Sequence, residues 1–186
     1  MTLMRKLCES VRSCAKRPLM IADAASMYAA KAAGLATEFD IFTPDLCEMA
    51  FLADPDASHP AYINKHLFEA DIVDVPELVA AAYQLKSAAR LLLVKGAVDY
   101  IAEDGKVVDI VSEPNIPELE AIGGTGDVIT GIVSALAYAG FELREAAKTS
   151  ALVNRMAGKL ARPSPATRVW EVISQLPAAL EQRRIY

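Results

Sequence analysis

Hydrophobic positions in the first half of the chain follow two patterns, one helical and one extended. Leu3, Leu7 and Val11 recur at the spacing of one helical face, and Pro18 predicts the end of this first helix. Short runs of consecutive apolar residues indicate strands that are buried on both faces of a sheet. The runs predict strands at 19–22, 39–42 and 91–94, with helices over 24–35 and about 76–85. Apolar strands that alternate with helices favour a parallel α/β sheet covered on both sides.

The pattern changes after the third predicted strand. Segments 99–102 and 106–110 flank the turn at 103–105 (Glu-Asp-Gly), which predicts a β-hairpin at a sheet edge. Helical spacing then predicts three further helices, over 127–138, 142–160 and 167 to about 182. Because no linker or internal repeat interrupts the chain, we expect a single domain over residues 1–186.

The composition narrows the class of protein. With 53% hydrophobic and only 6% aromatic residues, the chain favours helices packed on a buried sheet over an aromatic-rich β fold. The net charge of -5 disfavours nucleic acid and anionic membranes as partners, although a local cationic pocket remains compatible with it. Cys8, Cys14 and Cys47 show no CxxC spacing, which favours a cytoplasmic location. No apolar run approaches the roughly 18 residues that a membrane span needs.

The segment 121–131 (Ala-Ile-Gly-Gly-Thr-Gly-Asp-Val-Ile-Thr-Gly) combines a glycine-rich turn with a carboxylate where a helix begins. Gly123, Gly124 and Gly126 allow several N–H groups to converge on an anion at a helix N-terminus. Beside such a site, Asp127 could take the proton of a hydroxyl that is being phosphorylated, or orient a hydrated Mg2+. The alternative is that this carboxylate only caps the helix and interacts with its dipole.

Further polar groups come directly after predicted buried strands. Asp45 and Glu48 follow the second strand, at the edge where open α/β sheets form their sites. Their oxygens suit a Mg2+ that keeps several waters and contacts phosphates, whereas helix-terminal charge is the alternative. Lys95 and Gly96 follow the third strand, so the Lys95 ammonium could contact a phosphate at the same edge, although a surface lysine is the commoner case. Asn154 could border an adenine, or take part in helix packing.

The order of these motifs resembles the ribokinase-like superfamily, and most closely its ATP- or ADP-dependent NAD(P)H-hydrate dehydratase branch. In that branch a strand ending in Asp-Ala-Asp precedes Thr-Pro-His-x-x-Glu, then Lys-Gly, then Gly-Thr-Gly-Asp-x-Leu-x-Gly, then Ala-Gly. The counterparts here are Asp23-Ala24, Thr43-Pro44-Asp45-x-x-Glu48, Lys95-Gly96, Gly124-Thr125-Gly126-Asp127 and Ala157-Gly158. The resemblance implies a mostly parallel sheet flanked by helices.

The resemblance also implies roles for individual residues. Asp127 matches the catalytic base, and Glu48 matches an acidic residue that helps to organise Mg2+ and phosphate. Asp45 stands where the dehydratases usually carry histidine, so its contact does not transfer directly. We therefore expect phosphate binding by Gly123, Gly124, Thr125 and Gly126, nucleotide binding by Lys95, Gly96 and Asn154, and indirect Mg2+ binding by Asp45 and Glu48.

The activity implied by the resemblance is repair of hydrated NAD(P)H with ATP or ADP and Mg2+. A sugar or vitamin-alcohol kinase and a non-catalytic nucleotide-binding subunit are the alternatives. Complete members of the superfamily run to roughly 250 to 300 residues, and this chain begins at the helix before a mid-sheet strand. We therefore expect the fold to be incomplete on its N-terminal side, with the deficit met by a further segment or by homo-oligomer formation. The expected ligand is a small molecule.

Overall fold

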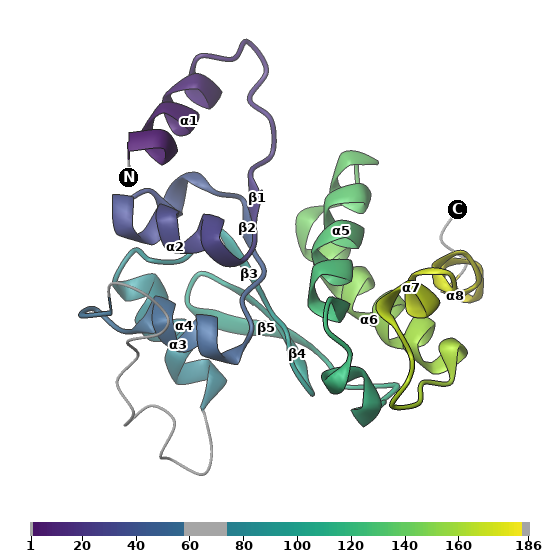
Figure 1. Ribbon diagram of the computed structural model, residues 1–186. Helices are drawn as coiled ribbons and strands as arrows, with labels where there is room; N and C mark the ends of the chain where they lie inside the picture. Colours follow the sequence, from purple (N-terminus) through teal and green to yellow (C-terminus); the bar gives the residue numbers. More distant parts are fainter. Residues whose placement is uncertain (1, 58–73, 184–186) are drawn as a thin grey trace. The chain divides into compact units, whose positions relative to one another are not determined.

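The computed structural model describes residues 2–57 and 74–183 and divides into two compact units. The first unit extends to Val94 and also includes Tyr100–Asp109. The second unit comprises Lys95–Asp99 together with the chain from Ile110 onward. Figure 1 labels the helices and strands of both units. Each unit has its own helices and apolar core, while the organisation of the chain as a single domain stays a prediction.

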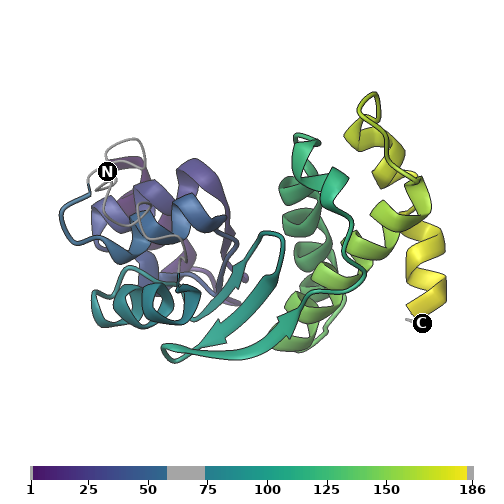
Figure 2. The ribbon, with the colours of Figure 1, turned by 90° about the horizontal axis from the view of Figure 1, so that it is seen from below.

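The first unit is built on a five-stranded sheet with the order β1-β2-β3-β4-β5. Its strands are β1 (Ile21–Ala22), β2 (Ile41–Phe42), β3 (Leu91–Val94), β4 (Asp99–Glu103) and β5 (Lys106–Val111). The first three strands are parallel, and β4 pairs antiparallel with β3. The predicted parallel sheet and the predicted edge hairpin are therefore confirmed, and Figure 2 shows the β4–β5 hairpin at the end of the sheet.

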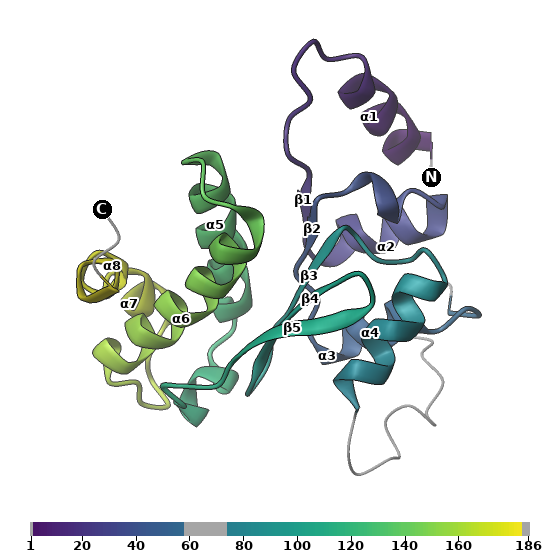
Figure 3. The ribbon, with the colours of Figure 1, turned by 180° about the vertical axis from the view of Figure 1, so that it is seen from behind.

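Helices cover one face of this sheet. They are α1 (Thr2–Arg12), α2 (Ala24–Ala33), the 3-10 helix η1 (Ala36–Glu38), α3 (Leu46–Ala53) and α4 (Val75–Gln84). Figure 3 shows α3 and α4 side by side, and α1 packs against α2. Phe42, Leu92 and Ala102 are paired across the sheet and all belong to the core that these helices close. Replacing Leu92 with alanine would cost about 2–5 kcal/mol, because the side chain is fully buried.

The strands β1 and β2 are shorter than the apolar runs that predicted them. The Met20 N–H donates to the Asp40 carboxylate at 2.7 Å, so it has a side-chain acceptor at the position where the ladder would begin. Arg17 holds the same carboxylate with two hydrogen bonds of 2.9 and 3.1 Å. Regular pairing begins at Ile21 and Ile41, and just before it the Met20 carbonyl accepts the N–H groups of Asp40 and Ile41.

The second unit is helical, apart from the strand ends that it shares with the sheet. Its elements are the 3-10 helix η4 (Pro117–Ala121), α5 (Thr125–Tyr138), α6 (Leu143–Ala161), α7 (Val169–Ile173) and α8 (Leu176–Arg183). The long α6 packs against α5, α7 and α8. The single helix predicted over 167–182 is wrong, because it is broken between α7 and α8. In a continuous helix the ring of Pro177 would clash with the carbonyl of Ile173.

A membrane-crossing helix is not found in the part of the chain that the structure describes: none of its helices is both long enough and apolar enough.

Candidate functional site

The glycine-rich turn forms the N-terminus of α5, in the second unit. Gly124 is the N-cap residue with a φ of 95°, and no described side chain caps the helix there. The N–H groups of Gly126 and Asp127 lie in the first turn, where a helix provides no backbone acceptor for them. The Asp127 side chain is exposed in the same turn. The backbone N–H groups of this turn form the kind of helix end that receives an anion, and the Asp127 carboxylate lies beside them.

Two contacts define the conformation of this turn. A β-carbon on Gly124 would lie 3.4 to 3.6 Å from the Val169 side chain, and its left-handed φ disfavours any other residue. The Thr125 hydroxyl donates to the carbonyl of Ile122 at 3.1 Å and lies 3.3 Å from that of Leu119. The Thr125 N–H also donates to the carbonyl of Ile122 at 3.4 Å, so both the side chain and the backbone of Thr125 hold the turn to the preceding segment. Phosphate binding by Thr125 stays a prediction.

Lys95 lies against this turn. It directly follows β3, and its Nζ atom is 3.4 Å from the point that a β-carbon on Gly126 would occupy. Both residues belong to the second unit. The structure thus brings together the cation and the glycine-rich segment that the sequence singled out separately. A phosphate contact by Lys95 and Gly96 stays a prediction.

Sequence reasoning missed the buried ion pair between Arg155 and Asp99. The Arg155 Nε donates to Asp99 Oδ2 at 2.7 Å, and the two side chains are only 7% and 2% exposed. The Asp99 Oδ1 also accepts the N–H of Gly96 at 3.1 Å. Burial raises the pKa of the Asp99 carboxyl, while Arg155 and the Gly96 N–H act in the opposite direction. The two residues are far apart in sequence, so residue spacing gave no signal for this contact.

Gly158 has no side chain, which allows η4 to lie close to α6. A β-carbon on Gly158 would lie 2.2 Å from Leu119 Cδ1, which is too close for any real contact. Leu119 is buried and belongs to the core of the second unit together with Ala157. Close packing therefore accounts for the Ala157-Gly158 motif, and it fixes the position of η4 just before the glycine-rich turn.

Asn154 lies on the same helix and is buried, with 5% of its surface exposed. Its Oδ1 atom makes no hydrogen bond with any residue that the structure describes. A buried carbonyl oxygen without a donor costs about 1–3 kcal/mol, so a donor from a bound molecule would be favourable there. Its predicted place beside an adenine stays a prediction.

Asp45 and Glu48 lie in the first unit, at the start of α3, and form a reciprocal capping box. The Glu48 N–H donates to Asp45 Oδ1 at 2.7 Å, and the Asp45 N–H donates to Glu48 Oε2 at 2.9 Å. The Tyr28 hydroxyl donates to Glu48 Oε1, and burial together with this bond raises the pKa of Tyr28. Within the described ranges, no group of three or more His, Cys, Asp or Glu residues is arranged to hold a metal ion. Indirect Mg2+ binding by these carboxylates stays a prediction.

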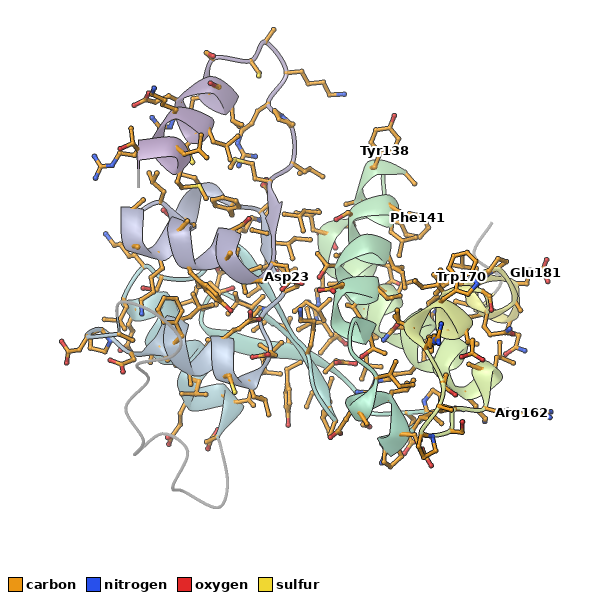
Figure 4. The ribbon with its side chains drawn as sticks, in the orientation of Figure 1. Asp23, Tyr138, Phe141, Arg162, Trp170 and Glu181 are labelled. Carbon is orange, nitrogen blue, oxygen red and sulfur yellow. The ribbon has the colours of Figure 1, made fainter. Side chains whose placement is uncertain are left out.

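An open pocket of about 350 Å3 lies within the second unit, and the polar residues described above are not among those that line it. Its walls come from α5, α6, α7 and α8, and they consist of aliphatic side chains and Gly131. Figure 4 shows two exposed aromatic side chains of this unit, Tyr138 at the end of α5 and Trp170 on α7. A phosphate needs hydrogen-bond donors, so this apolar pocket does not suit one.

Comparisons with known proteins agree with the fold and the motifs. The family model described as NAD(P)H-hydrate dehydratase matches residues 2–176. The protein MJ1337 of Methanocaldococcus jannaschii, which is uncharacterized, is 44% identical over 164 residues, covering 88% of this chain and 71% of that protein. The bifunctional NAD(P)H-hydrate repair enzyme Nnr of Hyperthermus butylicus is 32% identical over 102 residues, covering 54% of this chain and 18% of the enzyme.

A solved structure shows the same fold at low sequence identity. It is a protein of Bacteroides thetaiotaomicron provisionally assigned as a phosphomethylpyrimidine kinase, with a TM-score of 0.59 and 15% identity. The match covers 94% of this chain and 66% of that one, so the chain spans just under two-thirds of the kinase. The architecture is thus ribokinase-like, and the chain belongs to the NAD(P)H-hydrate dehydratase family.

Proposed function

We propose that this protein repairs hydrated NAD(P)H by phosphorylating the hydrate with ATP or ADP and then eliminating phosphate. The observation that carries the proposal is the end of α5, where uncapped backbone N–H groups lie beside the Lys95 ammonium. Membership of the dehydratase family supports the choice of substrate. A cytoplasmic location and a homo-oligomer are part of the proposal.

Each residue of the site has a distinct task in this proposal. The N–H groups of Gly126 and Asp127, with the Lys95 ammonium, would hold the oxygens of the transferred phosphoryl group. The Asp127 carboxylate would accept the proton of the substrate hydroxyl as its oxygen bonds to phosphorus. The nucleotide supplies the phosphoryl group, which converts a poor leaving group into a good one. Loss of phosphate and of a ring proton then restores the dihydropyridine.

The nucleotide and its metal fit two further features of the chain. The orphaned Oδ1 of Asn154 can accept a hydrogen bond from a donor on a bound molecule, such as an adenine amino group. The exposed carboxylate of Asp45 could orient water molecules around Mg2+. Glu48 is already committed to the capping box and to Tyr28, so we assign it the support of Asp45.

The proposal is tested by following recovery of 340 nm absorbance from hydrated NADH, with Mg2+ and either ATP or ADP. Recovery that requires one nucleotide and is lost in Asp127→Asn is the expected result. Nucleotide consumption only with an added sugar or vitamin alcohol would replace the dehydratase proposal with a kinase, which shares the first step. Nucleotide binding without turnover of any acceptor would indicate a binding subunit. Sedimentation of the same sample tests the homo-oligomer.

A further inference from the structure

The guanidinium of Arg155 makes more contacts than an ion pair needs. Besides Asp99, it donates to the carbonyls of Ser112 at 3.2 Å, Gly96 at 3.0 Å and Ala97 at 2.9 Å. All of these groups belong to the second unit. A buried charge is costly unless its hydrogen-bonding capacity is used, and here four acceptors use it. Arg155 therefore holds the short connection between β3 and β4 onto α6.

Gly96 is the point in that connection that is held most closely. Its N–H is bound by the Asp99 carboxylate, and its carbonyl is bound by Arg155. Both polar groups of one residue are thus fixed by the two members of the ion pair. Since Lys95 precedes Gly96 directly, the backbone from which the Lys95 side chain extends is fixed as well.

The direction of the Lys95 side chain matters because its Nζ atom lies against Gly126, in the first turn of α5. We propose that Arg155 is a positioning residue, which acts through Gly96 to keep the Lys95 ammonium where a nucleotide phosphate binds. The inference rests on the proposed nucleotide site. A lysine at position 155 would keep the charge but lose the planar fork that binds several acceptors at once.

A double-mutant cycle tests this role. Binding of Mg-ATP and Mg-ADP is measured by calorimetry for Arg155→Lys, Lys95→Ala and the double variant. If Arg155 acts through Lys95, Arg155→Lys weakens binding about tenfold in the natural chain, but less than about twofold when Lys95 is already absent. Equal losses in both backgrounds would overturn the proposal and leave Arg155 with a purely structural role.

Arg162→Lys is the matched control. This arginine is the C-cap residue of the same helix, and Figure 4 shows its side chain extending away from the unit. The same chemical change there should leave nucleotide binding unaltered in both backgrounds. If Arg155→Lys does not fold, Asp99→Asn replaces it in the cycle, because it removes the partner charge with almost no change of shape.

Amide hydrogen exchange separates this inference from the proposed function. In the free protein, Arg155→Lys should speed exchange of the Gly96 N–H by at least about tenfold, whereas Arg162→Lys should not. Unchanged exchange at Gly96 would overturn the positioning role even if nucleotide binds normally. Failure of the natural chain to bind either nucleotide would instead refute the proposed function, and with it the role of Lys95 at a phosphate.

Discussion

The Nζ atom of Lys95 lies 3.4 Å from the position that a β-carbon on Gly126 would take. The Lys95 side chain therefore lies against the first turn of α5, at the helix end where the N–H groups of Gly126 and Asp127 are found. This contact joins the loop that follows β3 to the glycine-rich turn. It also makes the site open to tests by substitutions that leave the rest of the fold intact.

Gly126→Ala should lower nucleotide affinity without lowering the stability of the protein. The new methyl group would meet the Lys95 side chain at 3.4 to 3.6 Å and would fill the space in which a phosphate could contact both Lys95 and the first turn of α5. We therefore expect nucleotide affinity to fall by about three- to tenfold, which is under 1.4 kcal/mol. Alanine favours a helix over glycine by about 1 kcal/mol, so the melting temperature should stay level or rise. Gly131→Ala is the control, because no described atom lies within 4 Å of its new β-carbon. Loss of affinity in both variants would mean that the Lys95 contact is not the cause.

Gly158→Ala should destabilise the protein by about 1–3 kcal/mol, since the added methyl group would overlap the Leu119 side chain. Chemical denaturation measures the effect. Adding Leu119→Ala removes the clash, so the double variant should be less destabilised than the sum of the two single changes. Strict additivity would show that the two residues are not in contact.

Asp127→Asn tests the catalytic base. Turnover of hydrated NADH should fall by roughly a hundred- to ten-thousandfold, because the amide cannot accept the proton. Nucleotide affinity should stay within a few fold, since the carboxylate is not expected to hold the nucleotide. Surviving turnover with a collapse of affinity would favour the alternative in which this side chain only supports the helix end.

Two substitutions of Asp45 distinguish its role as a helix cap from a role in organising Mg2+. Asp45→Ala removes the capping acceptor and should cost about 0.5–2 kcal/mol of stability, whereas Asp45→Asn retains a good cap. If the Asp45 charge orients water around Mg2+, Asp45→Asn should still raise the Mg2+ concentration needed for nucleotide binding. An unchanged Mg2+ requirement would limit Asp45 to the capping box.

The raised pKa of Tyr83 predicts how the stability of the protein changes at alkaline pH. Its hydroxyl lies 2.9 Å from the Arg90 carbonyl and 3.1 Å from that of Ala102, and burial raises its pKa. The folded pKa thus exceeds the unfolded value of about 10, so its stabilising contribution is complete below pH 10 and is lost as the pH rises further. In urea titrations, Tyr83→Phe should therefore lose less stability above pH 10 than the natural chain. If the free energy of unfolding falls equally steeply with pH in both proteins above pH 10, the raised pKa of Tyr83 would be contradicted.

Local patterns predicted much of the fold, and contacts between distant residues account for most of the remainder. The strand at Leu91–Val94 was predicted with its observed bounds, because four consecutive apolar residues are typical of a buried strand. The break between α7 and α8 lies just before Pro177. The prediction of one helix used only the spacing of apolar residues and did not take this proline into account. The hydrogen bond from the Met20 N–H to the Asp40 carboxylate joins residues 20 positions apart, and no periodicity in the sequence indicates it.

In the candidate site, too, features of consecutive residues were predicted and contacts between distant residues were not. The glycine-rich turn was recognisable because its residues are consecutive, whereas the pairing of Asp99 with Arg155 spans 56 positions. An arginine within a helical pattern is usually exposed, so its burial could not be read from the sequence. Asp45 and Glu48 were ambiguous for another reason. Their three-residue spacing suits a capping box and a metal-organising pair equally well.

The second unit does not correspond to one uninterrupted stretch of chain. A polypeptide beginning at Ile110 would retain Arg155 but would lack Asp99, Gly96 and Ala97, which supply most of its acceptors. Removing the partner of a buried charge typically costs about 3–5 kcal/mol, a large part of the stability of a small unit. Dissection of this protein into separately folding halves at that junction should therefore fail, even though α5 to α8 are continuous in sequence.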